Sequence, residues 1–459
     1  MHAKFVRIAA RAVGVGAVVT LGLAGVQSAA LAGPVTVMVP CSTSALAADI
    51  ATAVNGETLS LPSTCTYTLT AHLPVISVDL AIHGNGSTPQ TGATIARSTA
   101  GATPAFSLLT VTDGADVLIS HVNFTNGDSV GTKCDPPVYD SGSGGAIFSE
   151  DGTLTVDGGT FTGNYGYNGG AIFSADGATV DDAVFTGNSA DEGGAIANGI
   201  IDSSCAVTGG NTRGSAVGKD LASKDLASED IGYQSSVIGS TFTGNSADDS
   251  GGAILVEEPM TVTGDSFTSN IAAYGGGMYV DGGDPTITGS TFTTNTSNVY
   301  GGGIYSDDYL TVTGGSFTHN IADDAYGGGI YNAGDLTVNR VAIARNSSYE
   351  YGGGIYNEDN LTVSGGSFAG NGSEYGGGIY NDGSATVTGA AFRQNDAYDG
   401  GGIYNDNEIS VSHSQILENT ADDGGGIYND DADFTLSTSV VKGNHPENCA
   451  GDAVAGCIG

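Results

Sequence analysis

One phrase recurs about every 24 to 26 residues along most of this chain. A clear copy reads Tyr-Gly-Gly-Gly-Ile-Tyr-Asn over 351–357, Leu-Thr-Val over 361–363 and Gly-Gly-Ser-Phe-Ala-Gly-Asn over 365–371. The apolar residue after the glycines keeps this step at Ile147, Ile172, Ile196, Ile254, Met278, Ile304, Ile330, Ile355, Ile379, Ile403 and Ile427. A repeat of this length predicts a solenoid, because one unit cannot bury its apolar side without its neighbours.

Each repeat contains three short runs in which apolar and polar residues alternate, separated by Gly, Asn and Asp. Such runs are typical of β-strands, and the many glycines argue against helices. We therefore expect an all-β fold: a right-handed parallel β-helix with three short strands per coil of about 24–26 residues, capped at both ends. A leucine-rich repeat is the alternative at this period, but this chain lacks its Leu-rich signature and helical return.

The same alternation predicts which side chains face the core, because successive residues of a strand point to opposite faces. In the coil quoted above, we expect inward-facing Ile355, Leu361, Val363 and Phe368. We expect outward-facing Tyr356, Thr362 and Ser367.

An asparagine follows Phe or Ile by three residues in successive repeats. A residue that recurs once per coil stacks on its own copies, and stacked asparagines can form a hydrogen-bonded ladder. We therefore expect a structural role for Asn164, Asn188, Asn245, Asn270, Asn295, Asn320, Asn346, Asn371, Asn395 and Asn419.

Two landmarks of the repeat resemble a known family. Gly-Gly-Ala-Ile occurs at Gly144–Ile147, Gly169–Ile172, Gly193–Ile196 and Gly251–Ile254, in step with Phe-x-x-Asn. The pattern is similar to the repeats of chlamydial polymorphic outer-membrane proteins and of secreted bacterial β-helix proteins with a pectin-lyase-like fold, over roughly residues 110–445. This resemblance implies a surface-exposed passenger. In the polymorphic proteins an autotransporter barrel follows the passenger, whereas this chain ends at Gly459, so we expect no such anchor.

The first 32 residues have the features of a secretory signal peptide. Lys4, Arg7 and Arg11 precede an apolar run, and small residues end at Ala32, after which we expect cleavage and secretion. The apolar run is too short for a membrane span, and we see no second one. We expect a signal peptide at 1–32, an N-terminal cap and irregular coils at 33–110, repeats at 111–444 with loop insertions at 127–143 and 199–236, and a C-terminal disulfide cap at 445–459.

The N-terminal cap should contain the one helix of the mature chain, within residues 41–54. A helix there would cover the apolar core and strand edges of the first coil, which a solenoid must protect. We expect strands nearby at 59–61, 66–70, 76–82 and 108–112.

The mature chain is strongly acidic. Removing the three basic residues of the signal peptide takes the formal net charge from −38 to −41. Such acidity argues against nucleic acid and anionic membranes as partners. A glycan or a cell-surface protein is the partner class that we expect.

All six cysteines lie after the signal peptide, which favours disulfides. Fifteen pairings are possible in principle, and sequence proximity favours Cys41–Cys65 and Cys449–Cys457, one in each cap. Cys134 and Cys205 remain, one in each loop insertion, and a bridge between them would strap the loops across the glycine-rich face. A zinc site is the alternative, but no histidine lies near either cysteine.

Aromatic residues form two columns beside the glycines. One column follows the Ile or Met and contains Phe148, Phe173, Tyr279, Tyr305, Tyr331, Tyr356, Tyr380, Tyr404 and Tyr428. The other precedes the glycines and contains Tyr274, Tyr300, Tyr326, Tyr351 and Tyr375. We expect the first column to be a stacked, solvent-side row, whose tyrosines either stabilise neighbouring coils or bind a ligand such as a glycan.

Acidic residues gather in the turns, for example Asp323 with Asp324 and Asp422 with Asp423. One interpretation is a solvated acidic surface. The other is that they bind calcium as a cofactor at irregular sites, because calcium prefers several carboxylate and carbonyl oxygens.

An enzyme site is the remaining hypothesis. Polysaccharide lyases of the resembling fold use acidic calcium ligands and a Lys or Arg base, and the only base cluster conceivable here is Arg345 and Arg393 near Asp396. Near-uniform coils argue against one differentiated catalytic site. We therefore expect a non-enzymatic, adhesion-type protein that presents a Tyr- and Asp-rich face, with a polysaccharide lyase or glycoside hydrolase as the alternative.

Overall fold

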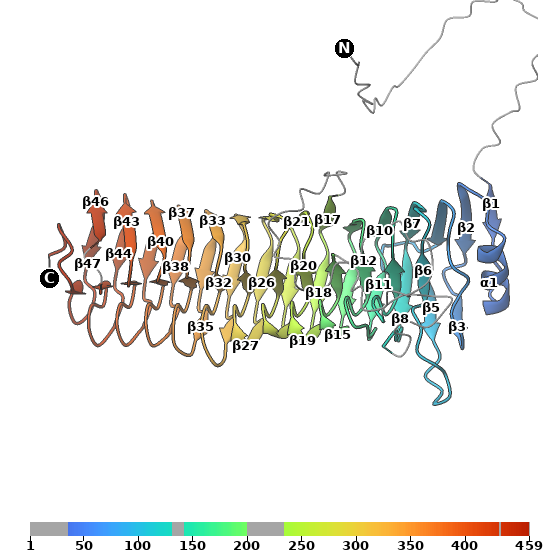
Figure 1. Cartoon of the computed structure of the whole chain (residues 1–459), viewed down its shortest axis with the longest axis horizontal. Coiled ribbons are helices and arrows are strands. Elements are labelled where there is room, and N and C mark those ends of the chain that lie inside the picture. The colour runs from blue at the N-terminus through green and yellow to red at the C-terminus, as the bar shows by residue number, and fades with distance from the viewer. Residues whose placement is uncertain (1–34, 131–141, 200–233, 431–432, 459) are drawn as a thin grey trace, which may run out of the picture. The chain divides into compact units, whose positions relative to one another are not determined.

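The computed structural model describes residues 35–130, 142–199, 234–430 and 433–458. From Val35 onwards the chain forms one compact unit, in which β-strands stack coil upon coil from the N-terminal to the C-terminal end (Figure 1). Every pairing between named strands is parallel, as in β33 with β37. The expected parallel β-helix is therefore confirmed.

Three sheets extend along the stack. The 15 strands of sheet A are β1 (Thr36–Met38), β2 (Glu57–Leu61), β4 (Leu80–Gly84), β7 (Val117–Ser120), β10 (Leu154–Asp157), β13 (Ala178–Asp181), β17 (Ser235–Ile238), β21 (Met260–Thr263), β25 (Thr286–Thr288), β29 (Leu310–Thr313), β33 (Asp335–Asn339), β37 (Asn360–Ser364), β40 (Ser384–Thr388), β43 (Glu408–Ser412) and β46 (Phe434–Ser437). The 14 strands of sheet B are β3 (Thr66–Leu69), β5 (Ala93–Arg97), β8 (Val122–Thr125), β11 (Thr160–Thr162), β14 (Val184–Thr186), β18 (Thr241–Thr243), β22 (Ser266–Thr268), β26 (Thr291–Thr293), β30 (Ser316–Thr318), β34 (Ala342–Ala344), β38 (Ser367–Ala369), β41 (Ala391–Arg393), β44 (Gln415–Leu417) and β47 (Val440–Lys442).

Sheet C contains the strands that follow the glycines. Its 13 strands are β6 (Leu109–Val111), β9 (Ile147–Ser149), β12 (Ile172–Ser174), β16 (Ile196–Asn198), β20 (Ile254–Val256), β24 (Met278–Val280), β28 (Ile304–Ser306), β32 (Ile330–Asn332), β36 (Ile355–Asn357), β39 (Ile379–Asn381), β42 (Ile403–Asn405), β45 (Ile427–Asn429) and β48 (Cys449–Gly451). Equivalent residues pair directly, so that Ile355 lies opposite Ile379 and Ile379 opposite Ile403.

A fourth sheet was not expected from the sequence. Sheet D has six short strands: β15 (Ser189–Glu192), β19 (Ser246–Ser250), β23 (Ile271–Tyr274), β27 (Thr296–Tyr300), β31 (Ile321–Ala322) and β35 (Ser347–Ser348). These strands occupy the segment between the asparagine and the next glycines, where we expected a turn. The prediction of three strands per coil is therefore incomplete for these coils. The sequence did not indicate them, because several contain Asp, Glu, Asn or Ala, which are depleted in strands.

The core runs inside the stack, as the alternation predicted. Ile355, Leu361, Val363 and Phe368 are at most 2% exposed. Phenylalanines of sheet B stack face to face with ring centroids 4.4 to 4.8 Å apart from Phe161 to Phe317. Thr362 points outward and is exposed, and Ser367 is half-buried.

The expected asparagine ladder is also confirmed. Asn371, for example, donates from its backbone N–H to Oδ1 of Asn395 at 3.0 Å and from Nδ2 to the same oxygen at 2.9 Å. Its Nδ2 also donates to the carbonyl of Ile343, in the coil before. Each asparagine side chain thus provides hydrogen-bond partners for buried backbone groups of neighbouring coils.

A second ladder was missed by the sequence analysis. This ladder consists of Asn332, Asn357, Asn381, Asn405 and Asn429, at the ends of strands in sheet C. Each of the first four donates from Nδ2 to Oδ1 of the next at 2.7 to 2.8 Å. The ladder has a direction, and its two end atoms, Oδ1 of Asn332 and Nδ2 of Asn429, find no partner among the described residues. The recurring Ile-Tyr-Asn triplet was the available signal.

The first glycine of each repeat is required by the backbone. Gly352 has a φ of +64°, and a Cβ there would lie 2.4 Å from the carbonyl oxygen of Ile355. The left-handed conformation turns the chain sharply into sheet C, and glycine adopts it without a steric cost.

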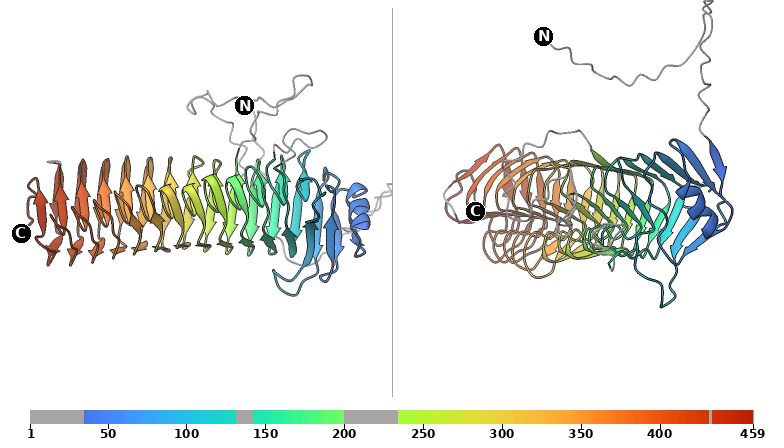
Figure 2. Two further views of the ribbon diagram at one scale, coloured as in Figure 1. Left: turned by 90° about the horizontal axis from the view of Figure 1, so that it is seen from below. Right: turned by 45° about the vertical axis from the view of Figure 1, so that its right-hand side comes forward.

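The N-terminal cap contains the expected helix, although it is shorter than the segment predicted. Helix α1 (Thr43–Ala51) buries Leu46 and Ile50 and lies across the first coil (Figure 2). Cys41 and Cys65 are joined by a disulfide, as expected. The strand predicted at 76–82 begins only at Leu80, because Ile76 forms an isolated bridge to Val111.

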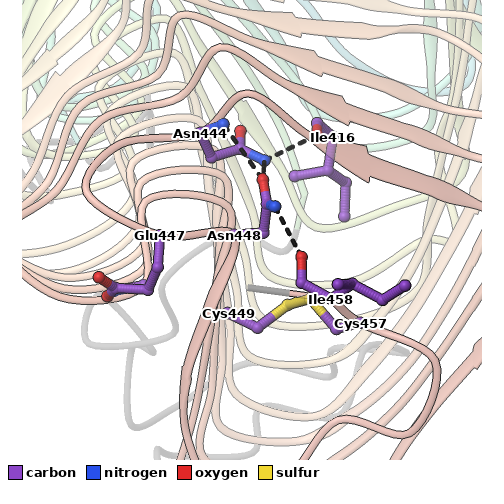
Figure 3. Close-up of a disulfide and its surroundings, with 8 residues drawn as sticks. Ile416, Asn444, Glu447, Asn448, Cys449, Cys457 and Ile458 are labelled. Atoms are coloured by element: carbon purple, nitrogen blue, oxygen red, sulfur yellow. Dashed lines mark hydrogen bonds between the residues drawn. A yellow bond between two sulfur atoms is a disulfide. The ribbon is translucent and has the colours of Figure 1, made fainter.

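The C-terminal cap ends the first asparagine ladder. Asn444 donates to Oδ1 of Asn448, which takes the place of an asparagine from a following coil, and Asn448 donates to the carbonyl of Ile458 at 2.7 Å (Figure 3). The expected disulfide between Cys449 and Cys457 holds this segment closed. The cap therefore satisfies polar groups that a truncated coil would leave unpaired.

Several expectations fall outside the described residues. These are the signal peptide, Cys134 and Cys205 with their bridge or zinc alternative, and most of both loop insertions. No helix among the described residues is both long enough and apolar enough to cross a membrane.

Candidate functional site

The tyrosines of sheet C form one continuous stack. We call Tyr279, Tyr305, Tyr331, Tyr356, Tyr380, Tyr404 and Tyr428 the inner tyrosine column. Consecutive rings lie nearly parallel, with centroids 4.7 to 5.4 Å apart. They stack because sheet C places equivalent residues of consecutive coils directly beside each other.

A second column packs against the first. We call Tyr274, Tyr300, Tyr326, Tyr351 and Tyr375 the outer tyrosine column. Each outer ring contacts the inner ring of the following coil, as Tyr351 does with Tyr380 at 4.6 Å and Tyr300 with Tyr331 at 4.7 Å. The two columns therefore interlock with an offset of one coil.

This interlocking corrects the expectation of a solvent-side row. Tyr331, Tyr356, Tyr380 and Tyr404 are only 6 to 8% exposed and form an apolar cluster of their own, separate from the main core. Tyr356 does point out of the coil, as predicted, but the outer column and the neighbouring rings cover it. The faces of these rings are occupied by other rings, so no sugar can stack on them without displacing a tyrosine.

Other residues occupy the column positions in the coils before and after the tyrosines. In the coils before Tyr279, the same position holds Phe148, Phe173, Ala197 and Leu255, which form a buried apolar cluster. After Tyr375, the position of the outer column is taken by Asp399 and Asp423. The interlocked part of the columns thus has defined ends.

Each central hydroxyl of the inner column meets a carboxylate in the next coil. Tyr356, Tyr380 and Tyr404 donate to Oδ2 of the acid that comes 26 residues later, each at 3.2 Å. The acceptors are Asp382, Asp406 and Asp430. Tyr331 donates in the same way to Glu358. The equivalent acceptor position for Tyr305 is occupied by Ala333, which carries no acid.

These surroundings raise the pKa of the tyrosines. Burial is the largest cause for Tyr331, Tyr356 and Tyr380, and the adjacent carboxylates add to it because they disfavour a second negative charge. In the outer column, burial together with Glu350 raises the pKa of Tyr351 to about 12. The phenols therefore stay protonated at neutral pH.

The predicted calcium ligands do not form a cluster. Asp323 and Asp324 directly follow β31 and are exposed, as are Asp422 and Asp423. Within the described part of the chain, no group of three or more His, Cys, Asp or Glu side chains is placed to hold a metal ion. Calcium binding stays a prediction, and a fall in Tm on adding a chelator would support it.

The predicted catalytic residues lie at or just after the C-terminal ends of β34 and β41 in sheet B. Arg345 and Arg393 are both exposed, and Nη2 of Arg393 donates to Oε1 of Gln415 at 2.7 Å. Asp396 continues the chain after the ladder residue Asn395, and no ion pair joins it to either arginine in the described ranges. A catalytic role for these three residues stays a prediction.

Comparison with known families adds one match. The Chlamydia polymorphic membrane protein repeat matches residues 182–199 and 239–257. In these two segments the chain is similar to that repeat. Each match runs from sheet B through sheet D into sheet C, for example from β14 through β15 to β16. Both matched repeats precede the tyrosine columns.

No curated protein shows a significant match to the chain. The repeat family is named for membrane proteins of Chlamydia, and the two disulfides fit an oxidising, extracellular compartment. Together they indicate a surface-type repeat protein.

Proposed function

We propose that this chain is a secreted, non-enzymatic surface protein that binds a positively charged protein surface along its length. The observation that carries the proposal is the uniformity of the site: the same tyrosine-to-carboxylate contact recurs at Tyr356, Tyr380 and Tyr404. Catalysis needs one differentiated group of residues, whereas binding to an extended partner uses many equivalent contacts.

The solvent-accessible part of the site consists of acidic side chains and half-buried tyrosine rings. The outer column is half-buried, and Glu358, Asp382 and Asp430 beside the inner column are exposed. A net charge of −38 over the whole sequence favours a cationic partner and fast, salt-sensitive association. A glycan partner is the competing outcome, and it would have to use the outer column, because the inner rings are covered.

The test is binding of the purified mature protein to an array of basic and acidic proteins and to a glycan array. We expect retention on basic proteins that weakens as salt rises from low to physiological concentration. The variant Asp382→Asn/Asp430→Asn should bind less than the control Asp323→Asn/Asp324→Asn, which removes the same charge from the segment after β31. Salt-insensitive retention on glycans alone would replace the proposed partner.

The enzymatic alternative needs a separate assay. Pectin, alginate and chondroitin are incubated with the protein, with and without calcium, while absorbance of unsaturated products is followed. Turnover of any polymer would overturn the proposal, and loss of that turnover in Arg345→Ala or Arg393→Ala would identify the base.

A further inference from the structure

The inner tyrosine column combines ring stacking with hydrogen bonds from its hydroxyl groups to carboxylates. Its rings are in contact from coil to coil, with Tyr331 and Tyr356 4.9 Å apart between centroids. Each central hydroxyl also donates its proton to its own carboxylate, as Tyr356 does to Asp382. Each ring from Tyr331 to Tyr404 therefore has a proton acceptor, which lies in the next coil.

Burial determines how such a ring can be oxidised. A tyrosine is protonated at neutral pH, and burial, which raises the pKa of Tyr356 and Tyr380, further disfavours the phenolate. Removing an electron from a neutral phenol makes its proton strongly acidic, so the proton must leave with the electron. The carboxylate that already accepts the hydrogen bond is in position to take it.

We propose that the inner tyrosine column carries one-electron oxidising equivalents from coil to coil. A one-electron oxidant takes an electron from the first tyrosine, whose proton passes to its carboxylate, leaving a neutral tyrosyl radical and a carboxylic acid. The radical then takes an electron from the next ring and recovers its own proton. The next tyrosine gives its proton to the carboxylate that accepts its hydrogen bond, so charge balances within each tyrosine–carboxylate pair.

The surroundings favour migration over loss of the radical. The central rings are at most 8% exposed, which limits reaction with solvent species. The chain contains no tryptophan that would compete for the oxidising equivalent. The outer column offers a parallel route, since Tyr351 lies 5.4 Å from Tyr375 and Tyr375 lies 5.6 Å from Tyr404.

Because the outer column offers a second route, a variant that interrupts the relay must remove a tyrosine from each column. Replacing Tyr380 alone leaves the path through Tyr351 and Tyr375 intact. The double variant Tyr375→Phe/Tyr380→Phe removes both paths while keeping rings of nearly the same shape. Tyr309→Phe/Tyr349→Phe is the matched control, because both residues are more than half exposed and lie outside the columns.

The experiment places an aminotyrosine, which is oxidised more easily than tyrosine, at position 428 of the full mature chain. Photogenerated ruthenium(III) tris-bipyridine with persulfate supplies the oxidant, and electron paramagnetic resonance measures the aminotyrosyl radical. We expect the radical yield at 428 to fall several-fold in Tyr375→Phe/Tyr380→Phe and to stay unchanged in Tyr309→Phe/Tyr349→Phe. Equal yields in both variants would mean direct oxidation only and would overturn the relay.

A second variant tests the proton acceptors without touching the rings. Asp382→Asn/Asp406→Asn keeps a hydrogen-bond acceptor at each position but removes the base, and Asp323→Asn/Asp324→Asn is its control. We expect the yield at 428 to fall several-fold only in the first variant. Circular dichroism and Tm of each variant confirm that the stack is intact, and an unchanged yield in a folded Asp382→Asn/Asp406→Asn protein contradicts the proposal.

Discussion

The phenolic oxygen of Tyr356 donates a hydrogen bond to Oδ2 of Asp382, which lies in the next coil, 26 residues later and 3.2 Å away. Within its own coil, Asp382 follows Tyr380 by two positions. The tyrosine and acid of one repeat therefore bond to different neighbours, one before and one after. This shifted pairing ties each coil to both adjacent coils outside the main core.

The stacked ring of Tyr356 should be important for stability. We expect Tyr356→Ala to lower the free energy of unfolding by about 3–5 kcal/mol, because it removes a large ring from a buried cluster. Tyr356→Phe keeps the stacking and loses only the hydrogen bond to Asp382, at a cost of about 1–3 kcal/mol. Urea denaturation followed by circular dichroism measures both. Tyr309→Ala, at an exposed residue, should change stability much less than Tyr356→Ala.

The first asparagine ladder gives a second prediction. Asn371→Ala removes the Oδ1 that accepts both the N–H and the Nδ2 of Asn346, each at 3.0 Å. Two buried donors would lose their partner, at about 1–3 kcal/mol each. Asn360 is exposed and provides the control, since Asn360→Ala should be nearly neutral. Similar melting temperatures for the two variants would show that the ladder contributes little.

The repeat glycines separate two physical effects. Gly352 and Gly314 have almost the same φ, +64° and +66°, but a Cβ would clash only at Gly352. Gly314→Ala should therefore cost about 1–2 kcal/mol for the left-handed conformation alone. Gly352→Ala should cost clearly more, because the new methyl group meets the carbonyl of Ile355. Chemical denaturation of both variants measures the difference, and equal losses would exclude the clash as a cause.

Asp265 should make stability depend on pH. It is 1% exposed, and its Oδ2 has no partner among the described residues. Burial raises the pKa of Asp265 from 3.8 to about 7, although hydrogen bonds from the backbone at Ser240 and Thr263 oppose the rise. Between these two values the folded protein binds more protons than the unfolded chain, so the free energy of unfolding falls as pH rises from about 4 to 7.

Serine is the natural replacement for Asp265, because Ser240 and Ser290 occupy the equivalent positions in the adjacent coils. We expect Asp265→Ser to be more stable than the parent protein by roughly 2–4 kcal/mol at pH 8 and to show a small difference at pH 4. Denaturation at both pH values is the measurement. Asp323→Asn, an exposed acid, should leave the pH dependence of the parent unchanged, and a flat difference between parent and Asp265→Ser would refute the assignment.

The regular spacing of Ile355, Ile379 and Ile403 was enough to predict the coil, the stacking and the core, because a residue that recurs once per turn must meet its own copies. The two cap disulfides were predicted from the proximity of their cysteines in the sequence. The first asparagine ladder was predicted from the repeat period. Sheet D was missed because its strands share no common alternation of polar and apolar residues, and the second ladder because its polar residues pair only with neighbours in other coils. The burial of Tyr356 was missed for a related reason: alternation tells the direction of a side chain but not what covers it.

Periodicity by itself determined that this protein is a parallel β-helix with equivalent residues stacked along its length. Only the tertiary structure decided that the tyrosines are interlocked and hydrogen-bonded to acids of the following coil. The reason is that stacking depends on one repeat length, which can be read along the chain. The packing of one tyrosine column against the other depends on how the side chains of adjacent coils are placed in space, which cannot be read from the repeat length.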